Sequence, residues 1–493
     1  MKFKRFINNL WFVFGIVVLV LLLYYPAFST FYTNDDFFHF AISKADSLSD
    51  FINFFNPAYA VSGWDFYRPL STQTIYFLVD GVFGKNPFWA HVFLFALFAV
   101  LATLVYLFLS ELIKKKSTVL IAVFLYAVSA VHFAHLYFLG NQELVHGIFY
   151  LGGLYFWIRF LKQTKKVEWY FLSLLFFLFS LASKEFAITL PGLAVLLYGY
   201  LWFKKETKLN FLNLFKCLIP FGLICFIYGV LKLKFYGFGG RDSYIWQFSP
   251  GVLFNSLSWY GLWSLNLPEM FVDYVSFDGK INPDLWKYWS KQIIPIFVLF
   301  GIMILFLIYS LWLVFIEKKK KIQVFLMFAF GWFFIYLLPV LFLPWHKFAM
   351  YLTIPLVVVS ASIALLINNF KKQKALLIGV FLLIYFFLSY FSLKLSFQTN
   401  WITCGARIAR KVYIFINDNY YGPAKPIVIA FYDQKSNEEL PWKGSQQLKV
   451  ILSDQNFFEV YYDGVIKAEY LTENDISTSS ADIKIPTSKF LGY

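Results

Sequence analysis

Charged side chains are scarce in this chain of 493 residues: Asp, Glu, Lys and Arg together make up 14% of it, whereas 60% of the residues are hydrophobic. So few charges exclude an ordinary soluble domain. Apolar runs of about 20 residues, the length of a membrane-crossing helix, recur along most of the chain and exclude a disordered protein. The sequence therefore predicts a polytopic membrane protein, in agreement with its mean hydropathy of +0.63.

Cysteine and acidic residues are also few. The three cysteines, Cys217, Cys225 and Cys404, have no metal-ligand spacing, and the first two are expected to pack within one apolar segment. The 28 acidic residues are outnumbered by 43 basic ones, which gives a net charge of +15. In a soluble protein this excess would suggest nucleic acid. Here the basic residues collect in loops between apolar segments, so no nucleic-acid partner is expected.

Eleven apolar segments are long enough to cross a membrane, which predicts an all-α bundle. They cover residues 11–28, 87–110, 117–138, 143–161, 168–183, 185–203, 211–231, 289–315, 322–343, 347–368 and 375–395. Basic clusters precede the first segment and then occupy every second loop: "KFKR" (2–5), "KKK" (114–116), "KQTKK" (162–166), "KKETK" (204–208), "EKKKK" (317–321) and "KKQK" (371–374). This alternation predicts a multi-pass plasma-membrane (inner-membrane) protein with a cytoplasmic N-terminus and an extracytoplasmic C-terminus.

The first segment also fits a cleaved signal peptide, because it has a basic start and is followed by "PAFS". Its apolar stretch is longer than that of a typical signal peptide, however. The alternation of charge also holds when the segment is retained.

Two of the predicted extracytoplasmic loops, 29–86 and 232–288, are large. The first contains two stretches that mix aromatic and polar residues, as helices at a membrane surface do: "DDFFHFAISKADSLSDFINFF" and "YRPLSTQTIYFLVDGVF". The second contains the pair Arg241 and Asp242 and an apolar stretch, 250–267, for which an interfacial or a re-entrant position is expected.

The tail is polar, and we predict a boundary there between a transmembrane domain, 1–395, and a small extracytoplasmic α+β domain, 396–493. The tail begins with the amphipathic stretch "NWITCGARIARKVYIFINDN" and continues with "PIVIAFYD", "QQLKVIL" and "FFEVYYDGVIKAEYL". Within the last of these, Asp463 and Gly464 predict a two-residue hairpin. Such a domain is too short to hold a deep catalytic cleft of its own, although it could cover one.

The predicted topology gathers polar and ionisable residues on the extracytoplasmic side, whereas the helix cores hold almost no charge. A transporter more often keeps ionisable groups near the middle of the membrane. An acceptor hydroxyl needs a carboxylate base, and a lipid phosphate that leaves needs cations. The pattern therefore favours a membrane enzyme that moves sugar from a lipid-phosphate carrier. The residues are Asp35, Asp36, His39, Arg68, His132, His135, Asn141, Gln142, Glu143, His146, Lys184, Glu185, Arg241, Asp242, His346 and Lys347.

Each of these residues also has a simpler interpretation when it is taken alone. A carboxylate pair just outside a helix, such as Asp35 and Asp36, is often merely solvated. The "SKE" at 183–185 also fits a tight polar turn, and Lys347 fits a snorkelling anchor. His132 and His135 lie three residues apart, as metal ligands can, but histidine is more often a hydrogen-bonded interfacial residue. Their joint placement on one side of the membrane is what favours a site.

Several of these residues lie in short motifs that, in order and spacing, resemble the GT-C superfamily of polyprenyl-phosphate-sugar-dependent glycosyltransferases. The nearest likeness is to the protein O-mannosyltransferase group, including its tetratricopeptide-containing transmembrane members, and it covers about residues 10–400. No tetratricopeptide repeat is visible in the tail. The motifs are "DD" (35–36), "YRPLS" (67–71), "GNQEL" (140–144), "SKEFAITLP" (183–191) and "WHKFAMYLTIP" (345–355).

The resemblance implies a GT-C-like bundle with an extracytoplasmic active site, a dolichol- or undecaprenyl-phosphate-sugar donor, and transfer with inversion. It also implies roles for individual residues. Asp35 would be the general base, and Asp36 would position the acceptor or bind a metal. Glu143 matches the second-loop acid. The donor phosphate would be bound by Arg68, Lys184, Lys347 and His346, and the supporting residues would be Tyr67, Glu185 and His135.

Some points stay open at this stage. His346 and Lys347 stand where the family has an acidic residue and an Arg, so the bidentate geometry of Arg is lost. A Mg²⁺ or Mn²⁺ ion between Asp35, Asp36 and Glu143 is one option, and neutralisation of these acids by Lys184 is the other.

The sugar is a hexose, with mannose one candidate, and the acceptor is a glycan, a lipid or a protein. The rival interpretations are a lipid-linked-glycan transporter or flippase and a polysaccharide ligase.

Overall fold

The computed structural model describes residues 2–59, 64–237, 244–370, 374–420, 425–434 and 443–491, with side chains from residue 11 onward. Arg241 and Asp242 lie outside the described residues. The larger part of the chain is helical. Its helices are α1 (Lys2–Leu23), α2 (Asp35–Ile42), α3 (Leu48–Asn53), α4 (Ile75–Phe83), α5 (Pro87–Leu112), α6 (Lys116–Ala127), α7 (Phe133–Tyr137), α8 (Glu143–Lys162), α9 (Val167–Leu181), α10 (Leu190–Phe203), α11 (Phe211–Phe235), α12 (Pro250–Ser264), α13 (Asp284–Ile316), α14 (Lys320–Leu337), α15 (Pro355–Ile367) and α16 (Lys374–Thr399).

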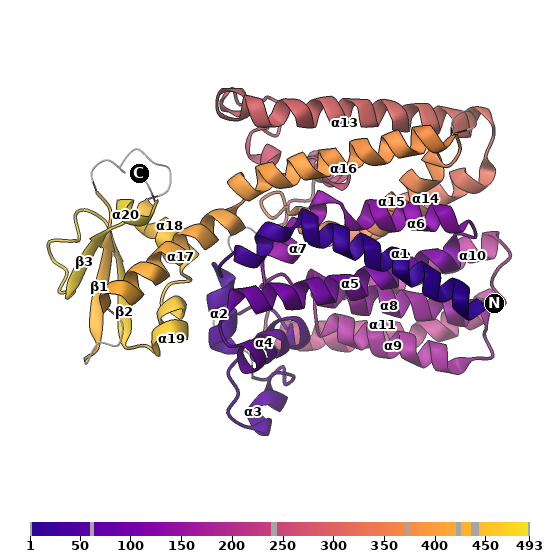
Figure 1. The fold of residues 1–493 in the computed structure, drawn as a ribbon. Helices are drawn as coiled ribbons and strands as arrows, with labels where there is room; N and C mark the ends of the chain where they lie inside the picture. Colours follow the sequence, from indigo (N-terminus) through magenta and orange to yellow (C-terminus); the bar gives the residue numbers. More distant parts are fainter. Residues whose placement is uncertain are drawn as a thin grey trace.

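The long helices run side by side as a bundle, with the short helices α2, α3 and α4 at one end and the N-terminus at the other (Figure 1). Local sequence sets several of the helix starts. Asn86 caps α5 by accepting the Phe88 N–H, and Pro87 follows at the first helical position. Ser249 caps α12 in the same way before Pro250. These caps fix where the connections leave the bundle.

Each of the eleven predicted apolar segments corresponds to an apolar helix. Within the described residues, seven helices are long and apolar enough to cross a membrane by themselves, and the bent pair Lys116–Ala127 and Ala130–Tyr137 would make an eighth. The remaining three predicted spans are shorter apolar helices, Trp11–Leu23, Val167–Leu181 and Pro355–Ile367. The chain is thus a polytopic membrane protein, and the predicted number is reached only if these shorter helices also cross.

The basic loops come together in space at the end of the bundle that holds the N-terminus. Lys162 Nζ lies 3.0 Å from the Glu111 carboxylate, and Lys204 Nζ donates to the Leu112 carbonyl at 3.1 Å. Lys115 Nζ donates to the Asn368 side chain at 3.1 Å. Loops that are far apart in sequence therefore share one face, as the charge alternation requires.

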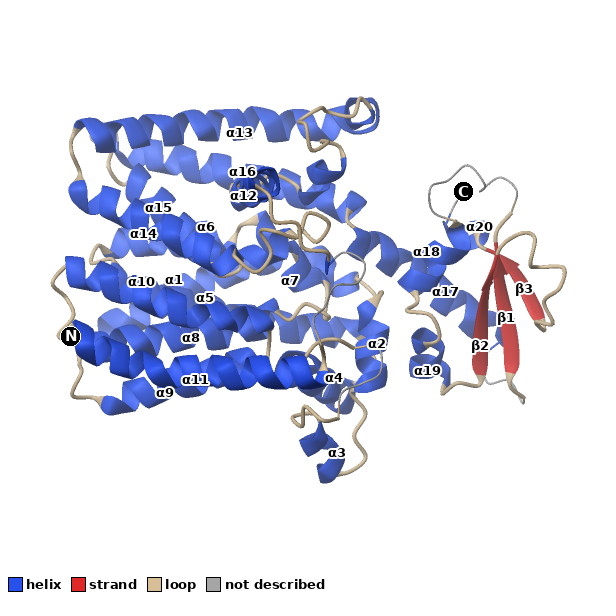
Figure 2. Cartoon of the chain, turned by 180° about the vertical axis from the view of Figure 1, so that it is seen from behind, coloured by secondary structure: helices blue, strands red, loops and turns tan. Residues whose placement is uncertain are grey.

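The surface helices expected in loop 29–86 are present as α2, α3 and α4, with a π-helical segment, Pro69–Thr74, before α4. The stretch 250–267 is largely helical as α12, which packs against the 3-10 segment Ala349–Leu352 and is seen end-on in Figure 2.

Residues after α16 form a small α+β domain beside α2 (Figures 1 and 2). It contains a parallel sheet of order β2-β1-β3. Its elements are α17 (Trp401–Tyr420), β1 (Ile427–Tyr432), α18 (Gly444–Ile451), α19 (Asn456–Tyr462), β2 (Ile466–Leu471), β3 (Ile483–Pro486) and α20 (Ser488–Leu491).

The hairpin predicted at Asp463 and Gly464 is wrong. "FFEVYY" is the helix α19, and Asp463 and Gly464, with φ of 47° and 72°, join it to β2. Both residues tolerate positive φ, which serves a helix C-cap as well as a hairpin turn. Tertiary packing decides between the two, since α19 packs against α2 and β2 pairs with β1.

Candidate active site

Asp36 is a closed, structural carboxylate. It is 1% exposed, and its Oδ1 accepts hydrogen bonds from the Tyr76 hydroxyl and, at 2.8 Å, from the Gly140 N–H. Its Oδ2 accepts the Thr33 N–H at 3.0 Å. Burial raises the pKa of Asp36 to about 7, although these three hydrogen bonds lower it. Asp36 therefore joins the start of α2 to α4 and to the "GNQEL" loop. Both of its carboxylate oxygens already accept hydrogen bonds, so they are not accessible to a substrate.

Asp35, its neighbour, is arranged in the opposite way. Its side chain is exposed, and its carboxylate makes no hydrogen bond with a described residue. Desolvation by the surrounding protein nonetheless raises the pKa of Asp35, and the positive charge of Arg68 acts against that rise. Asp35 is thus an accessible carboxylate with a raised pKa, close enough to Arg68 for their charges to interact.

Arg68 is paired with Glu185. Its Nε and Nη2 donate to the two carboxylate oxygens at 3.0 and 2.6 Å, and its Nη1 donates to the Gln142 side chain at 3.2 Å. The Phe66 ring lies 4.1 Å from the guanidinium carbon. Arg68 is 9% exposed, so this bidentate pair is largely withdrawn from solvent.

Lys184 is paired with Glu143. Lys184 Nζ lies 2.5 Å from Glu143 Oε1, and the two residues are 2% and 0% exposed. The Tyr351 ring lies 4.6 Å from the ammonium. Burial lowers the pKa of Lys184, and the charge of Glu143 opposes this change. We call Arg68, Gln142, Glu143, Lys184 and Glu185 the charge cluster.

The two histidines of the third predicted span bond to each other and to the backbone. His132 Nδ1 lies 2.9 Å from His135 Nδ1, and His132 Nε2 lies 2.8 Å from the Tyr126 carbonyl. His135 Nε2 lies 2.8 Å from the Thr353 hydroxyl. Both rings are fully buried, so His135 is a packing and hydrogen-bonding residue that supports the segment around Thr353.

His346 faces the charge cluster. Its Nε2 lies 2.6 Å from the Tyr351 hydroxyl, and its ring lies 4.0 Å from the Tyr244 ring. Burial, together with the positive charges of Lys184 and Arg68, lowers the pKa of His346 to about 4. The imidazole is therefore neutral near pH 7 and supplies no positive charge to a phosphate.

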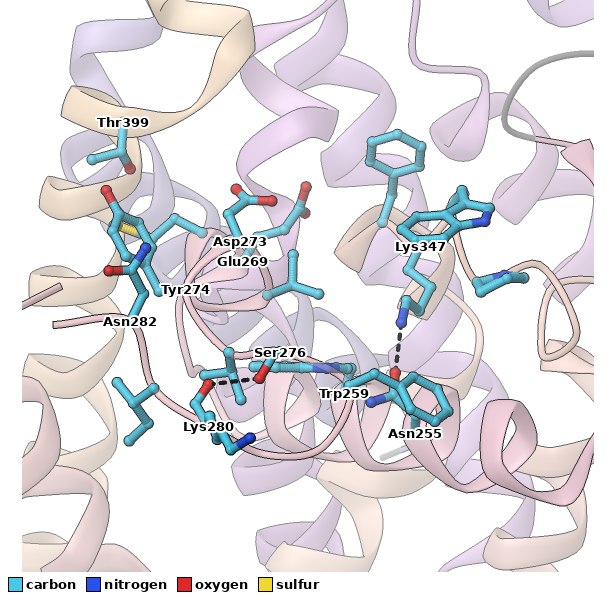
Figure 3. Close-up of a pocket in the computed structure, with 18 of the residues that line it drawn as sticks. Asn255, Trp259, Glu269, Asp273, Tyr274, Ser276, Lys280, Asn282, Lys347 and Thr399 are labelled. Carbon is cyan, nitrogen blue, oxygen red and sulfur yellow. Dashed lines mark hydrogen bonds between the residues drawn. The ribbon is translucent and has the colours of Figure 1, made fainter. Parts of the chain in front are cut away.

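Lys347, the next residue, faces a cavity of about 1260 Å³. Lys347 Nζ donates to the Asn255 side chain at 2.6 Å and forms no ion pair with a described residue (Figure 3). Glu269 and Asp273 line the same cavity, and Glu269 accepts the Ala349 N–H at 2.9 Å. We call this space the Lys347 cavity. Its aromatic lining includes Trp259, Tyr274, Phe277, Trp345 and Trp401.

The structure thus divides the predicted site residues into groups. Arg68, Glu143, Lys184 and Glu185 come together in the charge cluster, with His346 beside them and Asp35 within electrostatic reach of Arg68. Lys347 lies in a separate cavity. Tyr67 donates its hydroxyl to the Phe55 carbonyl at 2.9 Å and so fixes the loop before Arg68.

Sequence reasoning missed several residues that the structure brings to this end of the bundle. Asn255, Glu269 and Asp273 belong to loop 232–288, where the sequence analysis selected Arg241 and Asp242 instead. Tyr76 belongs to the stretch predicted as a surface helix, but nothing local indicates that it donates to Asp36. A signal for Glu269 was available, since it is an acid directly after a proline in an otherwise apolar stretch.

The three acids proposed as metal ligands do not form a metal site. Within the described ranges, no group of three or more His, Cys, Asp or Glu side chains is placed to hold a metal ion. Asp36 already accepts three hydrogen bonds, and one oxygen of Glu143 is held by Lys184. Of the two options left open by the sequence, the geometry fits neutralisation by Lys184.

Comparison with known proteins gives one family match. Residues 68–230 match the family described as dolichyl-phosphate-mannose-protein mannosyltransferase. The matched segment includes Arg68, Glu143, Lys184 and Glu185. The predicted likeness to the protein O-mannosyltransferase group is confirmed over this segment. No curated protein sequence matches the chain.

Two solved structures of an oligosaccharyltransferase from Archaeoglobus fulgidus are similar in part. One is AglB in complex with an inhibitory peptide and a dolichol-phosphate, with 10% identity and a TM-score of 0.49 over 89% of this chain. The other is the apo form, with the same identity and TM-score over 94% of this chain. The chain spans 63% and 65% of the lengths of those two chains, less than two thirds of each.

Proposed function

We propose that this protein is an extracytoplasmic membrane glycosyltransferase that moves a hexose from a polyprenyl-phosphate donor to an acceptor hydroxyl with inversion. The observation that carries the proposal is the contrast between Asp35 and the acids around it. Asp36, Glu143 and Glu185 are held by hydrogen bonds or ion pairs, whereas Asp35 is exposed and makes no hydrogen bond with a described residue.

The raised pKa of Asp35 suits a general base. A base works best when its pKa lies near the working pH, and desolvation moves the pKa of Asp35 in that direction. The positive charge of Arg68 opposes this rise. An acceptor that reaches Asp35 from solvent would therefore meet an accessible carboxylate whose basicity is increased by desolvation.

The Lys347 cavity contains a cation that could bind the phosphate of the donor. A phosphate that leaves with two negative charges requires a cation, and Lys347 is bonded only to a neutral amide among the described residues. Arg68 and Lys184, the other proposed phosphate ligands, are each committed to a carboxylate. We therefore assign the donor phosphate chiefly to Lys347. The charge cluster contributes through its electrostatic field and by fixing the loops that carry its residues.

The reaction follows from these roles. The acceptor oxygen attacks the anomeric carbon of the sugar while the bond from that carbon to the phosphate oxygen breaks. The electron pair of the broken bond goes to the polyprenyl phosphate, and the acceptor proton goes to Asp35. Attack from the face opposite the phosphate inverts the anomeric configuration, as in inverting glycosidases. No step is assigned to a metal ion, because Asp35, Asp36 and Glu143 form no metal site within the described part of the chain.

The charge alternation and the position of the basic loops support an extracytoplasmic orientation for Asp35. The basic loops gather at the end of the bundle that holds the N-terminus, and α2 lies at the other end. By the positive-inside rule, we therefore infer that α2 and the Lys347 cavity lie outside the cytoplasm.

Substitution of Asp35 tests the proposal. Purified protein in lipid nanodiscs is given polyprenyl-phosphate mannose, glucose or galactose with a radiolabelled sugar, and glycan, lipid and protein fractions of the cell envelope serve as acceptors. Asp35→Asn is expected to lower transfer about 10³-fold, within the range found for loss of a general base, with donor binding retained. Asp46→Asn, an exposed aspartate nearby, is the matched control and should transfer sugar normally.

Any of three outcomes would contradict the proposal, the third being the substrate preference of a ligase. One is full transfer by Asp35→Asn. Another is movement of the labelled donor across a vesicle membrane by wild-type protein without any sugar reaching an acceptor, which would identify a transporter instead. A pyrophosphate-linked oligosaccharide as the only substrate would identify a polysaccharide ligase.

A further inference from the structure

The segment that carries Asp35 packs against the C-terminal domain. Phe37 packs edge-on against Phe457 of α19, with ring centroids 5.1 Å apart. The Phe31 ring contacts Tyr413 of α17 and Tyr461 of α19, with ring centroids 5.3 and 5.9 Å away. These contacts fall on both sides of Asp35 in the sequence, so the domain packs against the segment before and after Asp35.

The turn before Asp36 contains a residue, Asn34, whose backbone dihedral angles are unfavourable for a residue other than glycine. The Asp36 N–H donates to the Thr33 carbonyl at 3.1 Å, which closes a tight turn with Asn34 and Asp35 at its corners. Asn34 has φ of 51° and ψ of −122°, a combination that glycine adopts readily and other residues rarely do. The Asn34 N–H donates to the carbonyl of Ile451, the last residue of α18, at 2.8 Å. A backbone contact from the C-terminal domain thus helps to hold a strained turn.

Gly405 of α17 lets the two parts come close enough for this. A Cβ atom added at Gly405 would lie 2.5 Å from Thr33 Oγ1 and 3.1 Å from Asn34 Oδ1. Thr33 is fully buried, and its hydroxyl donates to Asn34 Oδ1 at 2.6 Å, so it cannot move aside without breaking that bond. The approach of α17 to the turn therefore depends on a missing side chain.

The same helix also reaches the donor side of the site. Trp401, one turn before Gly405 on α17, lines the Lys347 cavity. Its ring packs edge-on against Phe138 at 5.3 Å, two residues before Gly140, whose N–H binds Asp36. Because residues four apart lie on one helix face, α17 contacts the Asp35 turn and the wall of the cavity with the same face.

We propose that the C-terminal domain positions Asp35 for catalysis by clamping the turn at Thr33 and Asn34 between Gly405 of α17 and the carbonyl end of α18. This inference rests on the proposed role of Asp35 as general base. Gly405 and Asn34 are positioning residues, since they act through the backbone of Asp35 and touch no reacting atom.

Side chains of increasing size at Gly405 test the clamp. Gly405→Ala is expected to lower kcat at least 10-fold and Gly405→Val further, while KM for polyprenyl-phosphate mannose stays within about 2-fold. Thr33→Ala combined with Gly405→Ala removes the atom that the new Cβ would strike and should restore much of kcat. The matched control is Gly379→Ala on α16, where an added Cβ meets nothing within 4 Å, and its kcat should be unchanged.

The outcomes separate this inference from the proposed function. If Gly405→Val leaves kcat unchanged while Asp35→Asn abolishes transfer, the clamp is wrong and the proposed function stands. If Asp35→Asn retains transfer, the proposed function itself fails. If Gly405→Ala folds poorly, the double variant decides, because restored folding without restored kcat would show a purely structural role for the contact and overturn the inference.

Discussion

The charge cluster and the Lys347 cavity hold their charges in opposite ways. In the charge cluster each cation bonds a carboxylate directly, Arg68 to Glu185 and Lys184 to Glu143, and the cations are almost fully buried. In the cavity Lys347 bonds the neutral Asn255 and stays half-buried. His346 and Lys347 are consecutive residues, yet one faces the cluster and the other faces the cavity.

This difference shows which ions are available for chemistry. In a buried ion pair, the attraction between the two charges is largely offset by the free energy of removing them from water. The pair nevertheless fixes the positions of the loops that it joins. The turn at 183–185 is also fastened to the segment after Arg68, since the Ser71 hydroxyl donates to the Ser183 carbonyl at 2.5 Å. A cation with a neutral partner next to open space can still bind an anion. The cluster is therefore expected to govern stability and the cavity to govern donor binding.

The largest expected effect comes from breaking the charge cluster. Lys184→Met leaves Glu143 fully buried without its cation, and Glu143 Oε2 already makes no hydrogen bond with a described residue. Removal of one partner of a buried pair costs about 3–5 kcal/mol, so a large fall in the thermal unfolding midpoint in detergent is expected. The double variant Lys184→Met/Glu143→Leu should recover most of this loss. A Lys184→Met protein as stable as wild type would contradict the assignment.

Substitution of Lys347 in the cavity should lower turnover and leave stability nearly unchanged. Lys347→Met is expected to lower turnover about 100-fold, which corresponds to about 2.7 kcal/mol of transition-state stabilisation, and to leave the unfolding midpoint nearly unchanged. Lys347→Arg keeps the positive charge and should retain most of the activity. Steady-state transfer assays and thermal unfolding on the same preparations check both parts. Normal turnover by Lys347→Met would remove Lys347 from the donor site.

The helices and the end of the bundle that holds the site were predictable from sequence, because both follow from local signals. Apolar runs of membrane length gave the segments that became α5, α8, α13 and α16, and charge alternation gave the end at which the basic loops meet. Each apolar run lies within about 25 neighbouring residues, and the charge alternation needs only the order of the loops along the chain, so neither signal needs knowledge of the fold.

The partners within the site were not predictable, because they are distant in sequence. Lys184 meets Glu143 across 41 residues, and Asp36 meets Gly140 across 104 residues. Asp35 and Asp36 look equivalent as "DD", and only the fold gives the Asp36 carboxylate three hydrogen bonds and the Asp35 carboxylate none with a described residue. The Asp463–Gly464 pair failed for a related reason, since the dipeptide fits a helix end as well as a hairpin.

The smallest expected effect is a pH dependence of stability that arises from Glu269, which lines the Lys347 cavity. Burial and repulsion from Asp273 raise the pKa of Glu269 to about 7 from an ordinary value of 4.5, although the Ala349 N–H lowers it. The folded protein therefore binds this proton more tightly than the unfolded chain does. The contribution of Glu269 to stability is present below pH 4.5, is lost as the pH rises to about 7 and is constant above that.

Glu269→Gln should remove this dependence, because glutamine stays neutral and can still accept the Ala349 N–H. The variant should gain stability relative to wild type between pH 5 and pH 8, by about 1 kcal/mol once the partial exposure of Glu269 to the cavity is allowed for. Asp36, whose pKa is also raised to about 7, is present in both proteins and cancels in the difference. An equal difference in unfolding midpoint at the two pH values would contradict a pKa of Glu269 near 7 in the folded protein.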